Sequence, residues 1–112
     1  MGKFILGPLM ILHGLIHLIG FAKGFRLAEM TQLSMPISRP VGLLWLTGAI
    51  LFSAAAAVLF LGKIWWWPIA AAGLVLSQIL VVMFWKDAKF GTIANVLILA
   101  GLVLIQCRIL KI

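Results

Sequence analysis

Apolar residues fall into four long runs, separated by short stretches that carry charge. A window of about 19 residues, which suits a membrane helix, places the runs at about 4–22, 41–61, 64–85 and 92–110. A helix of about 20 residues spans a hydrocarbon core about 30 Å thick. No run alternates like a barrel strand. We therefore expect an all-α membrane protein with one four-span transmembrane domain over residues 1–112.

The connections between these runs differ in length and character. Those that follow the second and third runs are very short, so consecutive helices should lie side by side and antiparallel in a four-helix bundle. The first connection, residues 23–40, is longer and mixes charged, apolar and proline residues. This mixture favours an amphipathic first loop in the membrane interface, and it fits a solvated linker as well.

Composition supports a chain embedded in lipid and excludes other classes. Of 112 residues, 65% are hydrophobic and 10% are charged, and the mean hydropathy is +1.27. Soluble domains carry about a quarter charged residues. The net charge of +7 comes from basic residues scattered between the apolar runs, which is typical of flanks that meet lipid head groups and does not indicate nucleic-acid binding. The lone cysteine, Cys107, is expected to be a small apolar residue of the last run.

His13 and His17 are polar groups inside the first apolar run. Together with Gly20 and Gly24 they follow at steps of four, three and four residues, which places all of them on one stripe of a helix. Glycines let a neighbouring backbone approach closely. The stripe should therefore face the interior of the bundle, away from lipid.

Several kinds of chemistry fit two inward histidines. Imidazoles one turn apart can share a metal ion, although His13 and His17 would need further ligands and no acid lies inside a span. One ring could be an axial haem ligand, but two rings on one face cannot clamp a single haem. The pair, with Asn95, could also handle protons or bind a quinone carbonyl. The structural alternative is that both rings only bond Asn95, Gln78, Gln106 or backbone carbonyls across the bundle.

Small and aromatic residues indicate packing and interface positions. Small residues spaced by four allow helices to approach closely, and tryptophans at the start of a span anchor at the level of the head groups. The expected packing residues are Gly20, Gly24, Ala49, Ser53, Gly73 and Ser77, and the expected anchors are Trp65, Trp66 and Trp67.

Several segments are similar to those of a known family. They are a first span ending in "HGLIHLIGFAKGF", a proline-bearing loop, "RPVGLLWLTGAILF", and two further spans joined by "KDAKFG". With this layout the chain resembles the DoxX-like group of small four-helix bacterial membrane proteins. The resemblance implies an inner-membrane location and an association with quinone-linked oxidoreductases or redox-stress complexes as an accessory subunit. It transfers no catalytic residues and does not account for the paired histidines.

We therefore expect an integral membrane accessory or assembly subunit of a larger, quinone-linked redox complex, without catalytic activity of its own. Its expected partners are the bilayer and other membrane subunits or further copies, and not nucleic acid. One alternative is a small redox or cofactor-binding protein that uses His13 and His17 for a quinone, haem or metal. Another is an oligomeric transporter or channel with a path lined by these histidines and Asn95.

Overall fold

The computed structural model describes residues 2–25 and 37–108, and within them it is all-helical apart from turns. The expected all-α fold is therefore confirmed for these ranges. The predicted amphipathic first loop falls mainly on residues 26–36, which lie outside the described residues. The helices are α1 (Gly2–Gly24), α2 (Arg39–Phe60), α3 (Trp66–Met83), the short α4 (Trp85–Ala88) and α5 (Gly91–Gln106).

Three of these helices are long and apolar enough to cross a membrane: α1, α2 and α3. Their outward faces are apolar too, since large side chains such as Leu12, Ile50 and Val82 are exposed, and this fits contact with lipid. An integral membrane protein is thus indicated. Helix α5 is apolar but has only 16 residues, fewer than the predicted run 92–110. It ends at Gln106, and Arg108 adopts a left-handed conformation with φ of 59° just beyond it.

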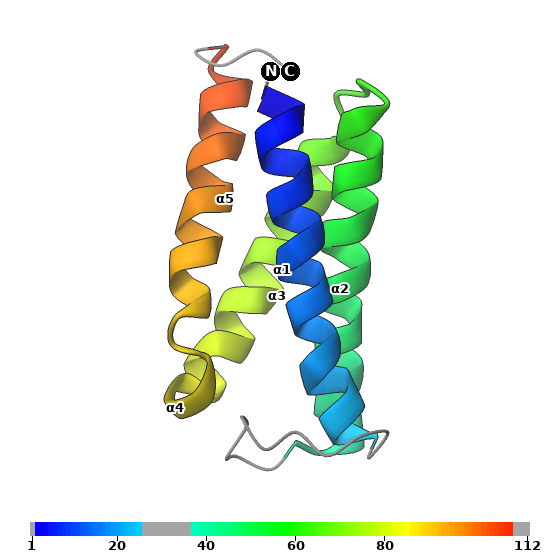
Figure 1. Cartoon of the computed structure of the whole chain (residues 1–112), viewed down its shortest axis with the longest axis vertical. Helices are drawn as coiled ribbons and strands as arrows, with labels where there is room; N and C mark the ends of the chain where they lie inside the picture. The colour runs from blue at the N-terminus through cyan, green and yellow to red at the C-terminus, as the bar shows by residue number, and fades with distance from the viewer. Residues whose placement is uncertain (1, 26–36, 109–112) are drawn as a thin grey trace.

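The four longer helices lie alongside one another (Figure 1). Helix α1 packs along α2, α2 along α3, and α5 meets both α1 and α3. In Figure 1, α3 is inclined behind α1, and α4 lies at the end opposite the start of α1 and the end of α5. Phe84 interrupts the helix between α3 and α4, because its φ of −114° and ψ of 39° are not helical.

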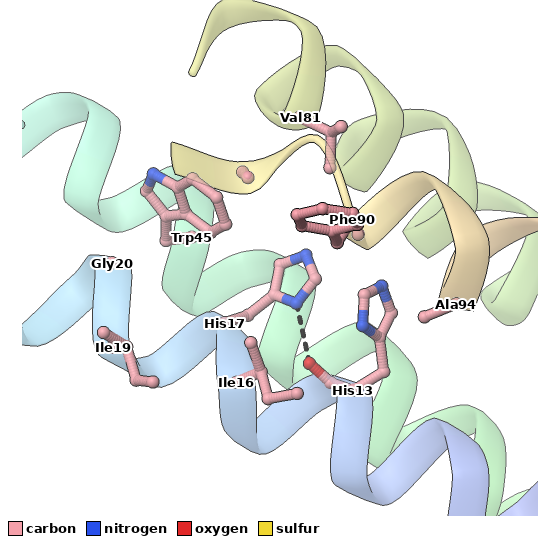
Figure 2. A pocket seen from close by; sticks show the side chains of 11 residues that line it. His13, Ile16, His17, Ile19, Gly20, Trp45, Val81, Phe90 and Ala94 are labelled. Atoms are coloured by element: carbon pink, nitrogen blue, oxygen red, sulfur yellow. Dashed lines mark hydrogen bonds between the residues drawn. The ribbon is translucent and has the colours of Figure 1, made fainter. Parts of the chain in front are cut away.

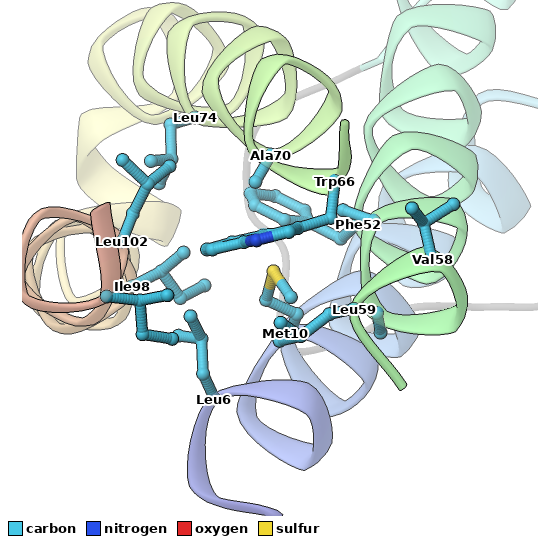
Figure 3. Close-up of a cluster of buried hydrophobic side chains, with 13 residues drawn as sticks. Leu6, Met10, Phe52, Val58, Leu59, Trp66, Ala70, Leu74, Ile98 and Leu102 are labelled. Atoms are coloured by element: carbon cyan, nitrogen blue, oxygen red, sulfur yellow. The ribbon is translucent and has the colours of Figure 1, made fainter. Parts of the chain in front are cut away.

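A cluster of apolar side chains fills one half of the molecule, toward the N-terminal end of α1. Trp66 lies at its centre, surrounded by Met10, Phe52 and Ile98 (Figure 3). Trp66 is 0% exposed, whereas Trp65 and Trp67 are 55% and 43% exposed. The expectation that all three tryptophans anchor at the head groups is therefore wrong for Trp66. Trp66 and Trp67 begin α3, and consecutive helical residues point about 100° apart, so Trp66 faces the interior while Trp67 faces outward.

Candidate functional site

His13 and His17 both lie in the interior, on the stripe that the sequence predicts. Their side chains are 3% and 1% exposed, and their ring centroids are 4.6 Å apart with the planes nearly perpendicular. Two glycines make room for this arrangement. A Cβ on Gly20 would overlap the Trp45 ring, and one on Gly48 would lie 2.9 Å from Cδ2 of His17. Helices α1 and α2 are therefore in close contact beside the histidines.

The hydrogen bonds of the two rings indicate where their protons are. Nδ1 of His17 donates to the backbone oxygen of His13 over 2.8 Å, and Nε2 of His13 donates to Oδ1 of Asn95 over 2.7 Å. Both partners are carbonyl oxygens, which only accept, so these two nitrogens carry the protons. Nδ1 of a neutral His13 is then a bare acceptor. It makes no hydrogen bond with any residue that the structure describes.

These bonds belong to a larger chain of polar contacts across three helices. Oγ of Ser77 lies 2.9 Å from Nε2 of His17 and 3.1 Å from Oδ1 of Asn95, and its one proton can be donated to only one of these two acceptors at a time. Nδ2 of Asn95 donates to Oε1 of Gln78 over 3.0 Å, and Nε2 of Gln78 donates to Oγ1 of Thr92 over 3.2 Å. We refer to the resulting set as the buried polar network: His13, His17, Ser77, Gln78, Thr92 and Asn95.

A pocket of about 360 Å³, the α1–α5 pocket, lies against the histidines (Figure 2). His13 and His17 form its polar wall, and the rest is apolar, with Trp45 and Phe90 as its aromatic members. Ile16 and Phe90 are exposed at its rim, so the pocket opens on the outer surface between α1 and the start of α5. In a membrane this surface faces lipid.

Gly91 keeps the inner part of this pocket free. A Cβ at this position would lie 3.0 Å from Cγ2 of Val81 and 4.0 Å from Cε1 of His13. A larger side chain would therefore fill the space in front of the imidazole. Gly91 follows the short helix α4, at the N-terminal end of α5.

A second pocket of about 430 Å³, the α3–α5 pocket, lies on another side of α5. It is lined by Gln78, Thr92 and Asn95 together with apolar residues such as Leu99. His13 belongs to the first pocket and Asn95 to the second, and they share a hydrogen bond. The buried polar network therefore joins the two pockets beside α5.

The geometry also bears on a metal site. Both nitrogens of His17 already have partners, as does Nε2 of His13, so an ion held by the two rings would displace these bonds. Within residues 2–25 and 37–108, no group of three or more His, Cys, Asp or Glu lies together. The sequence predicted Cys107 to be a small apolar residue within the last run. In the structure it lies just beyond the end of α5 and is exposed.

The other predicted packing residues have distinct positions. Gly73 packs against Phe52, and Ala49 and Ser53 lie next to Gly14 where α1 meets α2. Gly24 is the last residue of α1. Ser77 is buried, but as a member of the polar network and not merely as a small packing residue.

Sequence reasoning placed one polar residue wrongly and missed several positions beside the histidines. Gln106, an expected interior partner of the histidines, is exposed and does not share the interior position of Asn95. The roles of Thr92, Gly48 and Gly91 also went unpredicted, since each depends on which neighbour the helix faces. The small-residue spacing of Gly73 and Ser77 was the available signal for a close approach beside the histidines.

No protein-family model, curated protein or solved structure matches this chain. The DoxX-like resemblance consequently stays a hypothesis that rests on its sequence segments alone.

Proposed function

We propose that this chain, folded in the bacterial inner membrane as a four-span antiparallel bundle, binds a small lipid-soluble molecule of the quinone class in the α1–α5 pocket. The observation that carries the proposal is Nδ1 of the buried His13, which has no hydrogen-bond partner among the described residues and lies at the wall of an apolar pocket that opens on the outer surface.

The pocket has the properties of a small-molecule site. Its volume of about 360 Å³ falls within the usual range for ligand pockets, and its walls are apolar with few polar points. Trp45 and Phe90 offer flat surfaces to a ring, and His13 offers one hydrogen-bonding atom. A molecule dissolved in the bilayer could enter sideways, past Ile16 and Phe90, without crossing water.

The histidines would act in binding and positioning. A ring of the quinone class, in its quinone or hydroquinone form, would be held in this pocket at a fixed place relative to the helices, where a neighbouring redox subunit could exchange electrons with it. In this proposal the oxidoreductase chemistry belongs to that partner, and the chain is an accessory, ligand-positioning subunit. The DoxX-like resemblance points to the same association.

Binding can be tested with the purified protein in lipid nanodiscs. Titration with a short-chain quinone and its hydroquinone, followed by tryptophan fluorescence, should show saturable quenching, because the Trp45 ring lies 5.2 Å from that of His17. Ala94→Phe should block the pocket and abolish the signal. Leu12→Ala, which alters a lipid-exposed neighbour of His13, is the matched control and should bind as the wild type does. Absence of saturable binding to either form would refute the proposal.

A second role, as a subunit packed against another membrane helix, is favoured by a separate feature. A groove on the outer side of α1 and α2 is lined by Gly14, Ala49, Ser53 and Ala54 among larger apolar residues. Small residues let a further helix approach closely in lipid. Ala54→Phe should weaken assembly measured on native gels, whereas Ile79→Phe on the exposed face of α3 should not. Equal assembly of both variants would count against this role.

A further inference from the structure

We infer that the α1–α5 pocket selects a ligand that donates a hydrogen bond, such as a hydroquinone or phenol, over one that can only accept, such as the oxidised quinone. This inference rests on the proposed function and goes beyond it, because it names the chemical form of the ligand. The property that decides it is the direction of the hydrogen bonds behind His13.

The first step is the tautomer of His13. Its Nε2 faces Oδ1 of Asn95 at 2.7 Å, and an amide oxygen has no proton to give. The ring proton therefore lies on Nε2, inside the bundle. Nδ1 of the neutral ring carries a lone pair, and it is the nitrogen left for a ligand in the pocket.

The second step is what holds Asn95 in this orientation. Its Nδ2 donates to Gln78, which in turn donates to Thr92, and its Oδ1 lies within hydrogen-bond distance of the Ser77 hydroxyl. From His13 to Thr92 every bond thus runs in the same direction. Reversing the tautomer would require two amides, those of Asn95 and Gln78, to rotate together. Hydrogen bonds in such chains polarise and strengthen one another.

The third step is complementarity between Nδ1 and the ligand. A hydroxyl on the ligand can donate to this nitrogen, whereas a carbonyl oxygen would meet it lone pair to lone pair and gain no hydrogen bond. The other side-chain donor of the lining, Nε1 of Trp45, is buried without a partner among the described residues. In Figure 2 it is turned away from the two imidazoles, so it cannot serve a carbonyl placed at His13.

The test compares ligands that differ only in donor capacity. Dissociation constants are measured in nanodiscs for a short-chain hydroquinone, its oxidised quinone and its bis-O-methyl ether, with a monophenol of equal chain length as a fourth probe. We expect the hydroquinone to bind about tenfold more tightly than the quinone and the ether, which is the effect of one hydrogen bond of about 1.4 kcal/mol. A monophenol that binds as well as the hydroquinone would show that one hydroxyl is sufficient.

Variants of the network residues that orient Asn95, the partner of His13, test the ligand preference more directly. Gln78→Leu removes the acceptor for Nδ2 of Asn95 without touching the α1–α5 pocket, so Asn95 is free to turn and His13 can take either tautomer. We expect the preference for the hydroquinone to fall to less than about threefold. Thr47→Val, on the exposed face of α2 and outside the network, should keep the full preference.

The outcomes separate this inference from the proposed function. If no probe binds saturably, the proposed function fails. If hydroquinone, quinone and ether bind equally, or if the quinone binds best, the pocket stands and the donor selectivity is overturned. Nitrogen NMR of histidine-labelled protein gives a readout without ligand: wild-type His13 should show protonated Nε2 and bare Nδ1, and the reverse pattern would overturn the inference as well.

Discussion

The imidazole of His13 on α1 and the side-chain amide of Asn95 on α5 meet at 2.7 Å, although 82 residues separate them in the chain. Both side chains are buried, and α5 otherwise contacts α1 through apolar residues such as Leu6 with Gly101. In lipid there is little hydrophobic drive between helices, so packing and polar bonds of this kind hold them together. This contact both attaches α5 and orients the imidazole at the pocket.

A double-mutant cycle should detect this bond directly. His13→Leu and Asn95→Leu are each expected to lower the free energy of unfolding in detergent, and the double variant should lose less than the sum of the two. We expect a coupling energy of about 0.6–1.7 kcal/mol, the range for polar contacts between membrane helices. Strictly additive losses would show that the two side chains do not interact. Thr47→Val paired with His13→Leu is the control and should be additive.

Replacing Gly48 should displace the histidines from the α2 side. A Cβ there would lie 2.9 Å from Cδ2 of His17, so Gly48→Ala forces the ring to move and strains its bonds to Ser77 and the His13 carbonyl. We expect a lower melting temperature and weaker ligand binding in the α1–α5 pocket. The neighbouring Thr47→Ala, on the exposed face, should leave both nearly unchanged. A Gly48→Ala protein that melts and binds as the wild type does would contradict this packing.

His17 and Ser77 should behave as a mutually dependent pair. His17→Leu removes the acceptor that lies 2.9 Å from the buried Ser77 hydroxyl, which then keeps Oδ1 of Asn95 at 3.1 Å as its acceptor. Ser77→Ala should therefore lower stability less in the His17→Leu background than in the wild type, because one of its two contacts is already gone. Thermal unfolding in detergent of the two single variants and the double variant gives the comparison. Losses that add strictly would speak against this arrangement.

The neighbouring tryptophans should differ strongly in their effect on stability. Trp66→Ala empties the centre of the apolar cluster and should cost about 3–5 kcal/mol. Trp65→Ala, at an exposed position, should change stability by about 0.5 kcal/mol or less. Trp66→Phe should be milder than Trp66→Ala, because the indole N–H has no partner within the described residues. Equal effects of Trp65→Ala and Trp66→Ala would exclude the buried position.

Cysteine labelling tests how the helices cross the membrane. Cys107 is exposed and follows directly after α5, and Lys86 belongs to α4. The end of α5 lies at the same end of the molecule as the turn from α2 to α3, and α4 lies at the opposite end (Figure 1). A membrane-impermeant maleimide added to sealed vesicles should label Cys107 and, in a Cys107→Ser background, Lys63→Cys from the same side. Lys86→Cys should react only from the other side. Labelling of all three from one side would rule out four crossings.

Much of the helical content could be predicted from local sequence. Runs of apolar residues of membrane-spanning length are sufficient to indicate helices, because an isolated backbone in lipid must satisfy its own hydrogen bonds. The inward position of His13 and His17 also followed from spacing, since residues three and four apart share a helix face. The end of α5 did not follow, because apolar residues continue toward Arg108 while the backbone already turns at Cys107.

The amino-acid sequence by itself therefore determined that the chain suits a lipid environment and forms helices. It also determined the stripe of α1 that carries the two imidazoles. Only the tertiary structure decided what those imidazoles meet: Asn95 on α5, Ser77 on α3 and a pocket kept free by Gly91. The physical reason is that the periodicity of one helix tells only in which direction a side chain points around the axis of that helix. The partner depends on the rotation and crossing of the neighbouring helices, which are decided by packing contacts between residues far apart in the chain.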